Sequence, residues 1–333
     1  MKKKKKFKLF DMNRDGKGVR KDEDTRPTFL NFFKFLFRKF PQLLRLNLLM
    51  VVQVIPLIVI AFIYLLGPKS PTMSNVMFAP LFGIDQASGG NIVSATLDLS
   101  SIQMGLPVLS PPVTISMIAL IVIMAITWGW QNVGATYVLR GLVRGDPVFV
   151  FSDFFYAIKK NFKQGFILGL IDFIISSVLI VDFLYFIQRL NSFGLEFMFF
   201  ITVALIILWV IMRFYIYNLL ITFDIKIFKL VKNSLIFSVL GIGRNLLAFF
   251  GIALLTAFHI ILIIFFIPLG VSIPIIIPFF YLLATTAFMA CYAAYPVIDK
   301  YMIAPYANEE NEEEFIYFKE DNESDEDESV TEE

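Results

Sequence analysis

The sequence predicts an all-α membrane protein: a bundle of about six transmembrane helices with amphipathic helices at its cytoplasmic interface. Hydrophobic residues make up 57% of the chain, whereas soluble domains are typically about 45–50% apolar. These residues are gathered in long blocks, near the ~20 residues that a helix needs to cross hydrocarbon. Between the blocks lie basic segments with apolar residues at helical spacing, which is typical of helices in the membrane interface.

Six apolar blocks define the predicted spans. In chain order they are Leu43–Leu66, Val113–Leu139, Phe166–Phe186, Phe197–Ile221, Leu246–Phe266 and Val271–Ile298. Pro268, Pro274 and Pro278 interrupt the last region, so residues 265–298 form either one full span or a kinked, re-entrant element. An even number of spans places both chain ends on the same side of the membrane.

Basic residues are concentrated in the loops on one side of the predicted bundle. The loops at 140–165 and 223–245 are rich in lysine and arginine, whereas the opposite loops carry only Lys69 and Arg189. The positive-inside rule therefore predicts that both termini are cytoplasmic. Within the first of these loops, four side chains are expected to face anionic lipid headgroups: Arg144, Lys159, Lys160 and Lys163.

The chain divides into a membrane domain and two charged ends. The predicted parts are a basic cytoplasmic arm at 1–27, an interfacial helix at 28–42, a six-helix membrane domain at 43–304 and an acidic, disordered cytoplasmic tail at 305–333. The arm is expected to lie on anionic lipid, and the tail has too few apolar residues to fold. The long outer loop at 67–112 contains the apolar segment Val76–Ile84, which favours a packed lid over disorder.

The interfacial segments share a pattern that predicts three repeated units. Residues 31–42 align with residues 153–164, each with a pair of Phe near the start and basic residues opposite. Residues 225–235 repeat the apolar spacing, with Lys229 and Lys232 on the other face. Each unit is expected to be an interfacial helix followed by a helical hairpin.

Ionisable residues inside predicted spans are candidates for function, because charge is costly in hydrocarbon. Asp172 and Arg213 lie in the third and fourth spans, and a short connection makes these spans a hairpin. We therefore expect the two side chains to meet. The pair is either a structural ion pair, which spares each charge its desolvation cost, or part of a substrate or proton site.

Polar residues also cluster toward the inner end of the second span. Trp128 is typical of an interfacial anchor, and in that case the cluster has no further role. If the helix instead continues to Leu139, then Gln131 and Asn132 face the bundle interior and line a polar cavity. Both interpretations stay open at this point. Gln53 and Asn218 are further candidates for that lining.

The sequence offers no template for metal, cofactor or enzyme chemistry. With one Cys and one His, neither a disulfide within the chain nor a Cys/His metal site is expected. The segment Asp11–Asp22 resembles a calcium loop, but Asp22 stands where a bidentate Glu is expected, and the surrounding basic arm repels the ion. Neither a P-loop nor a Gly-x-Ser-x-Gly elbow is present. We expect a protein that is not an enzyme, with no cofactor and no nucleic-acid partner.

The stretch from Thr136 to Phe186 resembles the YesL-like family of bacterial integral membrane proteins, a domain of unknown function. The matching segments are Leu139-Arg-Gly-Leu-Val-Arg-Gly-Asp146, Phe151-Ser-Asp-Phe-Phe155 and Lys160-Asn-Phe-Lys-Gln164. Leu46-Asn-Leu-Leu and Asn233-Ser-Leu are also similar, whereas the outer loop and the acidic tail are departures. The resemblance implies a multi-pass protein of the bacterial plasma membrane, associated with carbohydrate uptake.

Two functions follow as expectations. The first is a non-enzymatic accessory or regulatory protein, with transporter subunits of a carbohydrate importer as its partners. The alternative is a small-solute transporter or channel that uses Asp172, Arg213, Gln131 and Asn132. Repeated units and proline-broken helices are features of transporters, and a polar cavity around the charged pair would favour the alternative.

Overall fold

A computed structural model describes residues 27–66, 69–72, 106–271 and 273–306. Among these residues, six helices are long and apolar enough to cross a membrane, which confirms the all-α membrane fold. The six are α1 (Phe29–Leu66), α4 (Pro111–Arg144), α6 (Phe162–Ile187), α7 (Phe193–Thr222), α9 (Ile242–Phe266) and α11 (Pro278–Ile298). The shorter elements are β1 (Lys69–Thr72), β2 (Leu106–Leu109), α5 (Val150–Lys160), α8 (Ile227–Leu240), α10 (Ile273–Ile276), a 3₁₀ turn (Ile267–Leu269) and a π-helical turn (Asp299–Ile303).

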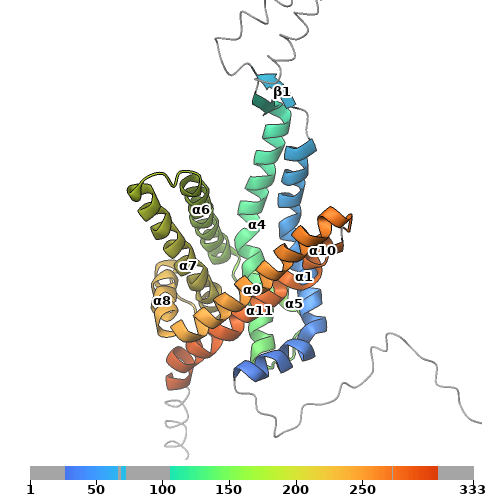
Figure 1. The fold of residues 1–333 in the computed structure, drawn as a ribbon. Coiled ribbons are helices and arrows are strands. Elements are labelled where there is room, and N and C mark those ends of the chain that lie inside the picture. Colours follow the sequence, from blue (N-terminus) through green and yellow to red (C-terminus); the bar gives the residue numbers. More distant parts are fainter. Residues whose placement is uncertain (1–26, 67–68, 73–105, 272, 307–333) are drawn as a thin grey trace, which may run out of the picture.

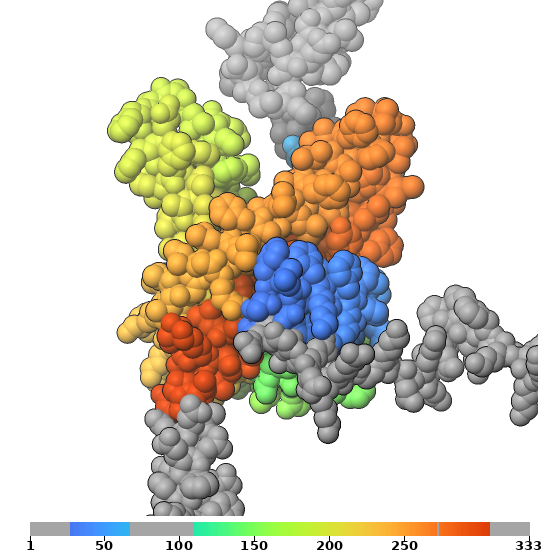
Figure 2. Space-filling view, turned by 60° about the horizontal axis from the view of Figure 1, so that its bottom comes forward, coloured from blue at the N-terminus to red at the C-terminus, as the bar shows by residue number. Residues whose placement is uncertain are grey.

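The long helices form three pairs that meet at one end of the molecule and diverge toward the other. The pairs are α1 with α4, α6 with α7, and α9 with α11 (Figure 1). In the space-filling view, the α6–α7 pair and the α9–α11 pair stand apart as separate lobes (Figure 2). The start of α1 and the end of α11 lie at the end where the pairs meet (Figure 1).

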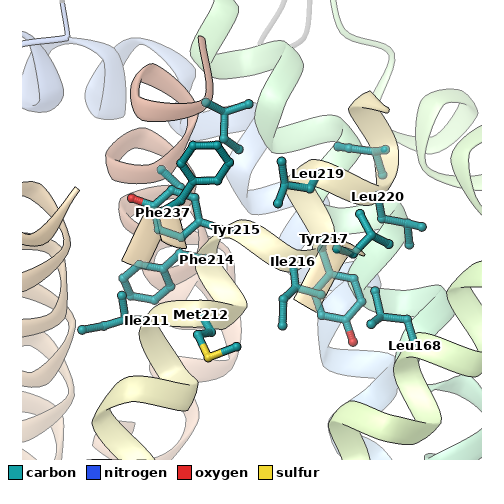
Figure 3. Packing of buried hydrophobic residues seen from close by; sticks show 14 of the residues in the cluster. Leu168, Ile211, Met212, Phe214, Tyr215, Ile216, Tyr217, Leu219, Leu220 and Phe237 are labelled. Atoms are coloured by element: carbon teal, nitrogen blue, oxygen red, sulfur yellow. The ribbon is translucent and has the colours of Figure 1, made fainter. Parts of the chain in front are cut away.

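The second helices of the three pairs form the centre of the bundle, because α4, α7 and α11 contact one another. The C-terminal half of α7 is enclosed on nearly all sides. Figure 3 shows its apolar side chains directed to both sides of the helix, with Tyr217 toward Leu168 of α6 and Tyr215 beside Phe237 of α8. A helix that is apolar all round is expected in such a position.

The order of the elements matches the three predicted units, each with a short helical segment before a hairpin. Each short segment packs on the last helix of another unit. Phe32 of α1 stacks on Phe288 of α11 with ring centroids 5.8 Å apart, and Phe237 of α8 stacks on Tyr215 of α7 at 5.9 Å. Phe154 of α5 lies against Gly134 of α4, where a side chain would leave no room. The three units therefore close into a ring.

Several boundaries differ in detail from the expected ones. Residues 28–42 are not a separate helix but begin α1, whose first part runs across the base before the helix turns along the bundle (Figure 1). Pro41 lies within α1. Because proline has no backbone N–H, the helix loses a hydrogen bond at this point and bends. After α9, the chain makes a 3₁₀ turn, a left-handed Gly270 (φ 74°) and the short α10. The chain is therefore broken at residues 267–277, before α11, and α11 is itself part of a helix long enough to cross a membrane.

The Arg-Gly-Asp sequence that follows the second span is the C-terminal cap of α4. Gly145 has φ 84°, a left-handed conformation that glycine adopts without steric cost, and its N–H donates to the carbonyl of Gly141. Arg144 forms a 3.4 Å ion pair with Asp146 across this turn. The side chains of Arg144, Lys159, Lys160 and Lys163 are all exposed.

Three predictions fall largely outside the described residues: the basic arm with its calcium-like segment, the lid in the outer loop and the acidic tail. The ends of that loop are described, and they form an antiparallel ribbon in which Lys69 pairs with Leu109 and Thr72 pairs with Leu106.

The crossing of α4 and α6 predicts a steric requirement for glycine. A Cβ on Gly129 would lie 2.7 Å from the Cα of Gly169, closer than any real Cβ contact, and backbone cannot move aside as a side chain can. Replacing Gly129 with Ala should therefore lower the free energy of unfolding in detergent by about 1–3 kcal/mol. The matched control is Gly243→Ala in α9, where a Cβ meets nothing within 4 Å. Equal stability of the two variants would contradict this packing.

Candidate functional site

The carboxylate of Asp172 is the most enclosed charged group of the described bundle, with its side chain 1% exposed. Trp128 Nε1 and the Tyr217 hydroxyl donate to Oδ2 at 2.8 and 2.7 Å. The Ser176 hydroxyl donates to Oδ1 at 3.3 Å, and Arg213 Nε lies 3.0 Å from the same oxygen. A buried carboxylate is tolerated only when it is paired and hydrogen-bonded in this way.

Local sequence explains how these groups meet. Gly129 and Gly169 let α4 and α6 approach closely, and this brings the neighbouring Trp128 of α4 to Asp172, one turn along α6. Trp209 of α7 adds an outer contact, because its Nε1 donates to the Ser176 hydroxyl at 3.1 Å. Three helices are thereby joined through one carboxylate.

Arg213 differs from its partner in that it is not enclosed. Its side chain is 29% exposed, and its guanidinium carbon lies 5.4 Å from the centre of the Trp128 ring. The Nε is buried and makes no directed hydrogen bond, so its contact with Asp172 is an ion pair. The two terminal Nη atoms make no hydrogen bond to any described residue.

Arg213 lines a cavity of about 330 Å³ between α1, α4, α7, α9 and α11. Asp172 is not part of the lining, so among the described residues Arg213 is the one charged side chain that reaches this cavity. Besides Trp128 and Tyr217 of the network around Asp172, the polar lining consists of amides and hydroxyls: Gln53, Gln131, Asn132, Thr136, Asn218 and Thr286. The single Cys291 lies in the lining too.

The hydrogen bonds of the amides fix their orientation. Gln131 Nε2 donates to the carbonyl of Leu49 at 2.9 Å, and Asn132 Nδ2 donates to the carbonyl of Trp128 at 2.8 Å. Only the NH₂ group of an amide can donate to a carbonyl, so the opposite atom of each side chain is an oxygen. These two oxygens accept no hydrogen bond from a described residue. The cavity therefore offers guanidinium donors together with amide acceptors.

The structure brings the four predicted site residues to one place: Arg213, Gln131 and Asn132 line the cavity, and Asp172 lies behind Arg213. The interpretation of Trp128 as an interfacial anchor is wrong, because its indole N–H is used inside the bundle. Trp130 fits the anchor role better, stacked on Phe162 at 4.5 Å.

Three members of the network escaped sequence reasoning: Tyr217, Ser176 and Trp209. Tyr217 lies one helical turn beyond Arg213, and Ser176 one turn beyond Asp172, so spacing of polar residues by four was an available signal. The sequence contains no comparable signal for Trp209, which is one of many apolar residues in its helix.

Other polar residues within the helices have local roles. The guanidinium of Arg189 lies over the Tyr185 ring, 4.0 Å from its centre. His259 is held by the Leu255 carbonyl at 2.8 Å and the Tyr281 hydroxyl at 2.6 Å, which is a packing arrangement. Arg45 is exposed. No group of three His, Cys, Asp or Glu residues that could hold a metal ion occurs in the described part of the chain.

A family model described as "Protein of unknown function, DUF624" matches residues 100–183. The matched region contains all of α4 and α5 and most of α6. It therefore includes Trp128, Gln131, Asn132 and Asp172, whereas Arg213 and Tyr217 lie beyond it. No curated protein and no solved structure matches the chain.

The enclosure of Asp172 predicts a large stability loss when the carboxylate is removed. Asp172→Ala leaves Arg213 without its counter-ion and three donors without their acceptor, so it should lower the free energy of unfolding by about 3 kcal/mol or more. Asp182→Ala on the same helix should change it by no more than about 0.5 kcal/mol, because Asp182 has no partner among the described residues. Thermal or denaturant unfolding in detergent measures both, and losses of similar size would refute the network.

Proposed function

We propose that the chain is a non-enzymatic membrane protein that binds a small polar solute in the cavity beside Arg213 and carries it across the membrane. The observation behind this proposal is the asymmetry of the charged pair. Asp172 is 1% exposed and surrounded by donors, whereas Arg213 is 29% exposed and its terminal nitrogens have no acceptor among the described residues.

A purely structural ion pair would not have this form. Arginine within a membrane span costs free energy, and burying both partners with a full set of hydrogen bonds reduces that cost most. Here the donors converge on one partner, and the other faces a cavity whose mostly apolar lining includes several amides and hydroxyls. Intramembrane charges that face a cavity are typical of substrate pathways. The volume of about 330 Å³ is at the lower end for ligand sites, which favours a small solute.

The proposal includes the orientation of the bundle in the membrane. Helix α5, which carries the exposed Lys159 and Lys160, lies toward the end of the bundle where α1 begins and α11 ends (Figure 1). By the positive-inside rule, we place this end in the cytoplasm and the ribbon of β1 and β2 outside, in a bacterial plasma membrane.

An accessory role in carbohydrate uptake is the competing proposal. Its support is the resemblance to the YesL-like family, together with the exposure of Arg144, Lys159, Lys160 and Lys163 at one end of the bundle. Those side chains would suit docking of a transporter subunit or anionic lipid. This role requires no solute in the cavity, and that difference separates the two proposals.

Cysteine labelling tests the solute pathway. In a Cys291→Ser background, Ala287→Cys places a single thiol in the cavity lining, and the control Val178→Cys places one on a 52% exposed, apolar stretch of α6. A charged, membrane-impermeant methanethiosulfonate should label position 287 about tenfold faster or more, because the reactive thiolate forms only in contact with water.

The labelling is carried out on intact cells and on inverted membrane vesicles. A transport pathway predicts reaction at position 287 from both faces of the membrane. Reaction from a single face would be consistent with solute binding but would contradict transport. If position 287 were as inert as position 178 in both preparations, the proposal would fail and the accessory role would be favoured.

A further inference from the structure

We infer the chemical class of the solute, an inference that rests on the proposed function: a small carboxylate that also carries a hydroxyl or ammonium group beside the carboxylate. The charge of the cavity indicates a negatively charged group on the solute. Arg213 reaches the cavity, and the compensating Asp172 does not. The pair is therefore a dipole whose positive end points at the solute.

The environment of Asp172 strengthens this dipole. Its oxygens already receive hydrogen bonds from Trp128, Tyr217 and Ser176 in addition to the contact with Arg213. With that many partners, the carboxylate does not depend on Arg213 alone. The guanidinium keeps its two Nη groups for the cavity, and these parallel donors match the two oxygens of a carboxylate.

The indole of Trp128 limits how Arg213 can turn. The guanidinium carbon lies 5.4 Å from the ring centre, and the same indole is fixed by its 2.8 Å hydrogen bond to Asp172. An arginine positioned before the ligand arrives loses less conformational entropy on binding. This favours a defined anion site over a loose electrostatic attraction.

The amides of the cavity indicate a hydrogen-bond donor on the solute. Gln131 and Asn132 use their NH₂ groups on the carbonyls of Leu49 and Trp128, so both present oxygens to the cavity. An acceptor oxygen is satisfied by a donor on the ligand. A hydroxyl or an ammonium next to the carboxylate supplies that donor, whereas a plain fatty acid supplies none.

The same lining disfavours the other simple classes. A cationic solute meets Arg213 with no exposed carboxylate among the described lining residues to attract it. A neutral polyol can satisfy the amides but offers the two Nη groups only separate hydroxyl acceptors, in place of the paired carboxylate oxygens that the guanidinium fork matches. Binding of a polyol is therefore the main contrary outcome of the test.

The experiment measures binding to the purified full-length protein in nanodiscs by isothermal titration calorimetry. The probes are lactate, glycerate and alanine, which have both groups; propionate, which lacks the donor; and lactamide and glycerol, which lack the negative charge. At least one probe of the first group should bind, and its neutral analogue should bind about tenfold more weakly or worse.

Two variants assign the binding to the cavity. Arg213→Lys replaces the planar fork by a point charge and should weaken binding roughly tenfold or more, whereas the control Arg189→Lys, outside the cavity, should leave it unchanged. If Arg213→Lys does not fold, Gln131→Met supplies a second test. It removes one of the two acceptors, so it should reduce the preference for lactate over propionate and leave carboxylate binding in place.

The outcomes separate this inference from the proposed function. If glycerol binds and none of the acids does, or if no probe binds while the thiol at position 287 remains reactive, the solute class is wrong and the pathway stands. If no probe binds and the thiol is inert, both are wrong. Binding of the acids that is unaffected by Arg213→Lys and by Gln131→Met overturns the assignment of the anion to this cavity.

Discussion

The buried carboxylate of Asp172 is the constraint on which the rest of the site depends. A carboxylate at membrane depth must be compensated, and here the compensation comes from three helices: Trp128 of α4, Ser176 of its own α6, and Arg213 and Tyr217 of α7. The need to satisfy one anion thereby fixes how α4, α6 and α7 sit together. Close contact at Gly129 and Gly169 makes the arrangement sterically possible. The direction of Arg213 toward the cavity follows from the same interactions.

The ring of three units explains why a cavity forms where it does. Each unit contributes its second long helix, α4, α7 or α11, to the centre, and each of these helices places polar residues on its central face. The short segments at the base close the ring through pairs such as Phe32 with Phe288 and Phe237 with Tyr215. Toward the other end the pairs of helices diverge (Figures 1 and 2). The central polar groups therefore lie between the packed end of the bundle and the end at which the helix pairs spread apart.

Much of this fold could be predicted from the sequence, because spans and interfacial segments are set by local hydrophobicity and period. The Asp172–Arg213 contact could be predicted too, since a hairpin with a short turn brings its two helices together. The sequence does not decide between the two interpretations of Trp128, because its partner Asp172 is 44 residues away in the chain and the preference of Trp for the interface is the stronger local signal. The start of α1 was separated from its span because basic residues suggested a boundary, whereas helical hydrogen bonding continues through it. Which amide oxygens face the cavity depends on contacts such as Gln131 with Leu49, and no local pattern encodes those.

The central claim is that Asp172 and Arg213 act as a coupled pair within the bundle, with the carboxylate holding the guanidinium in place. A double-mutant cycle on Asp172→Asn and Arg213→Gln, read as the free energy of unfolding in detergent, tests it most directly. The account predicts a coupling energy of about 0.5–3 kcal/mol, with the double variant less destabilised than the sum of the single ones. Additivity within about 0.3–0.5 kcal/mol would contradict it, because two residues that stabilise the bundle independently do not hold each other in position.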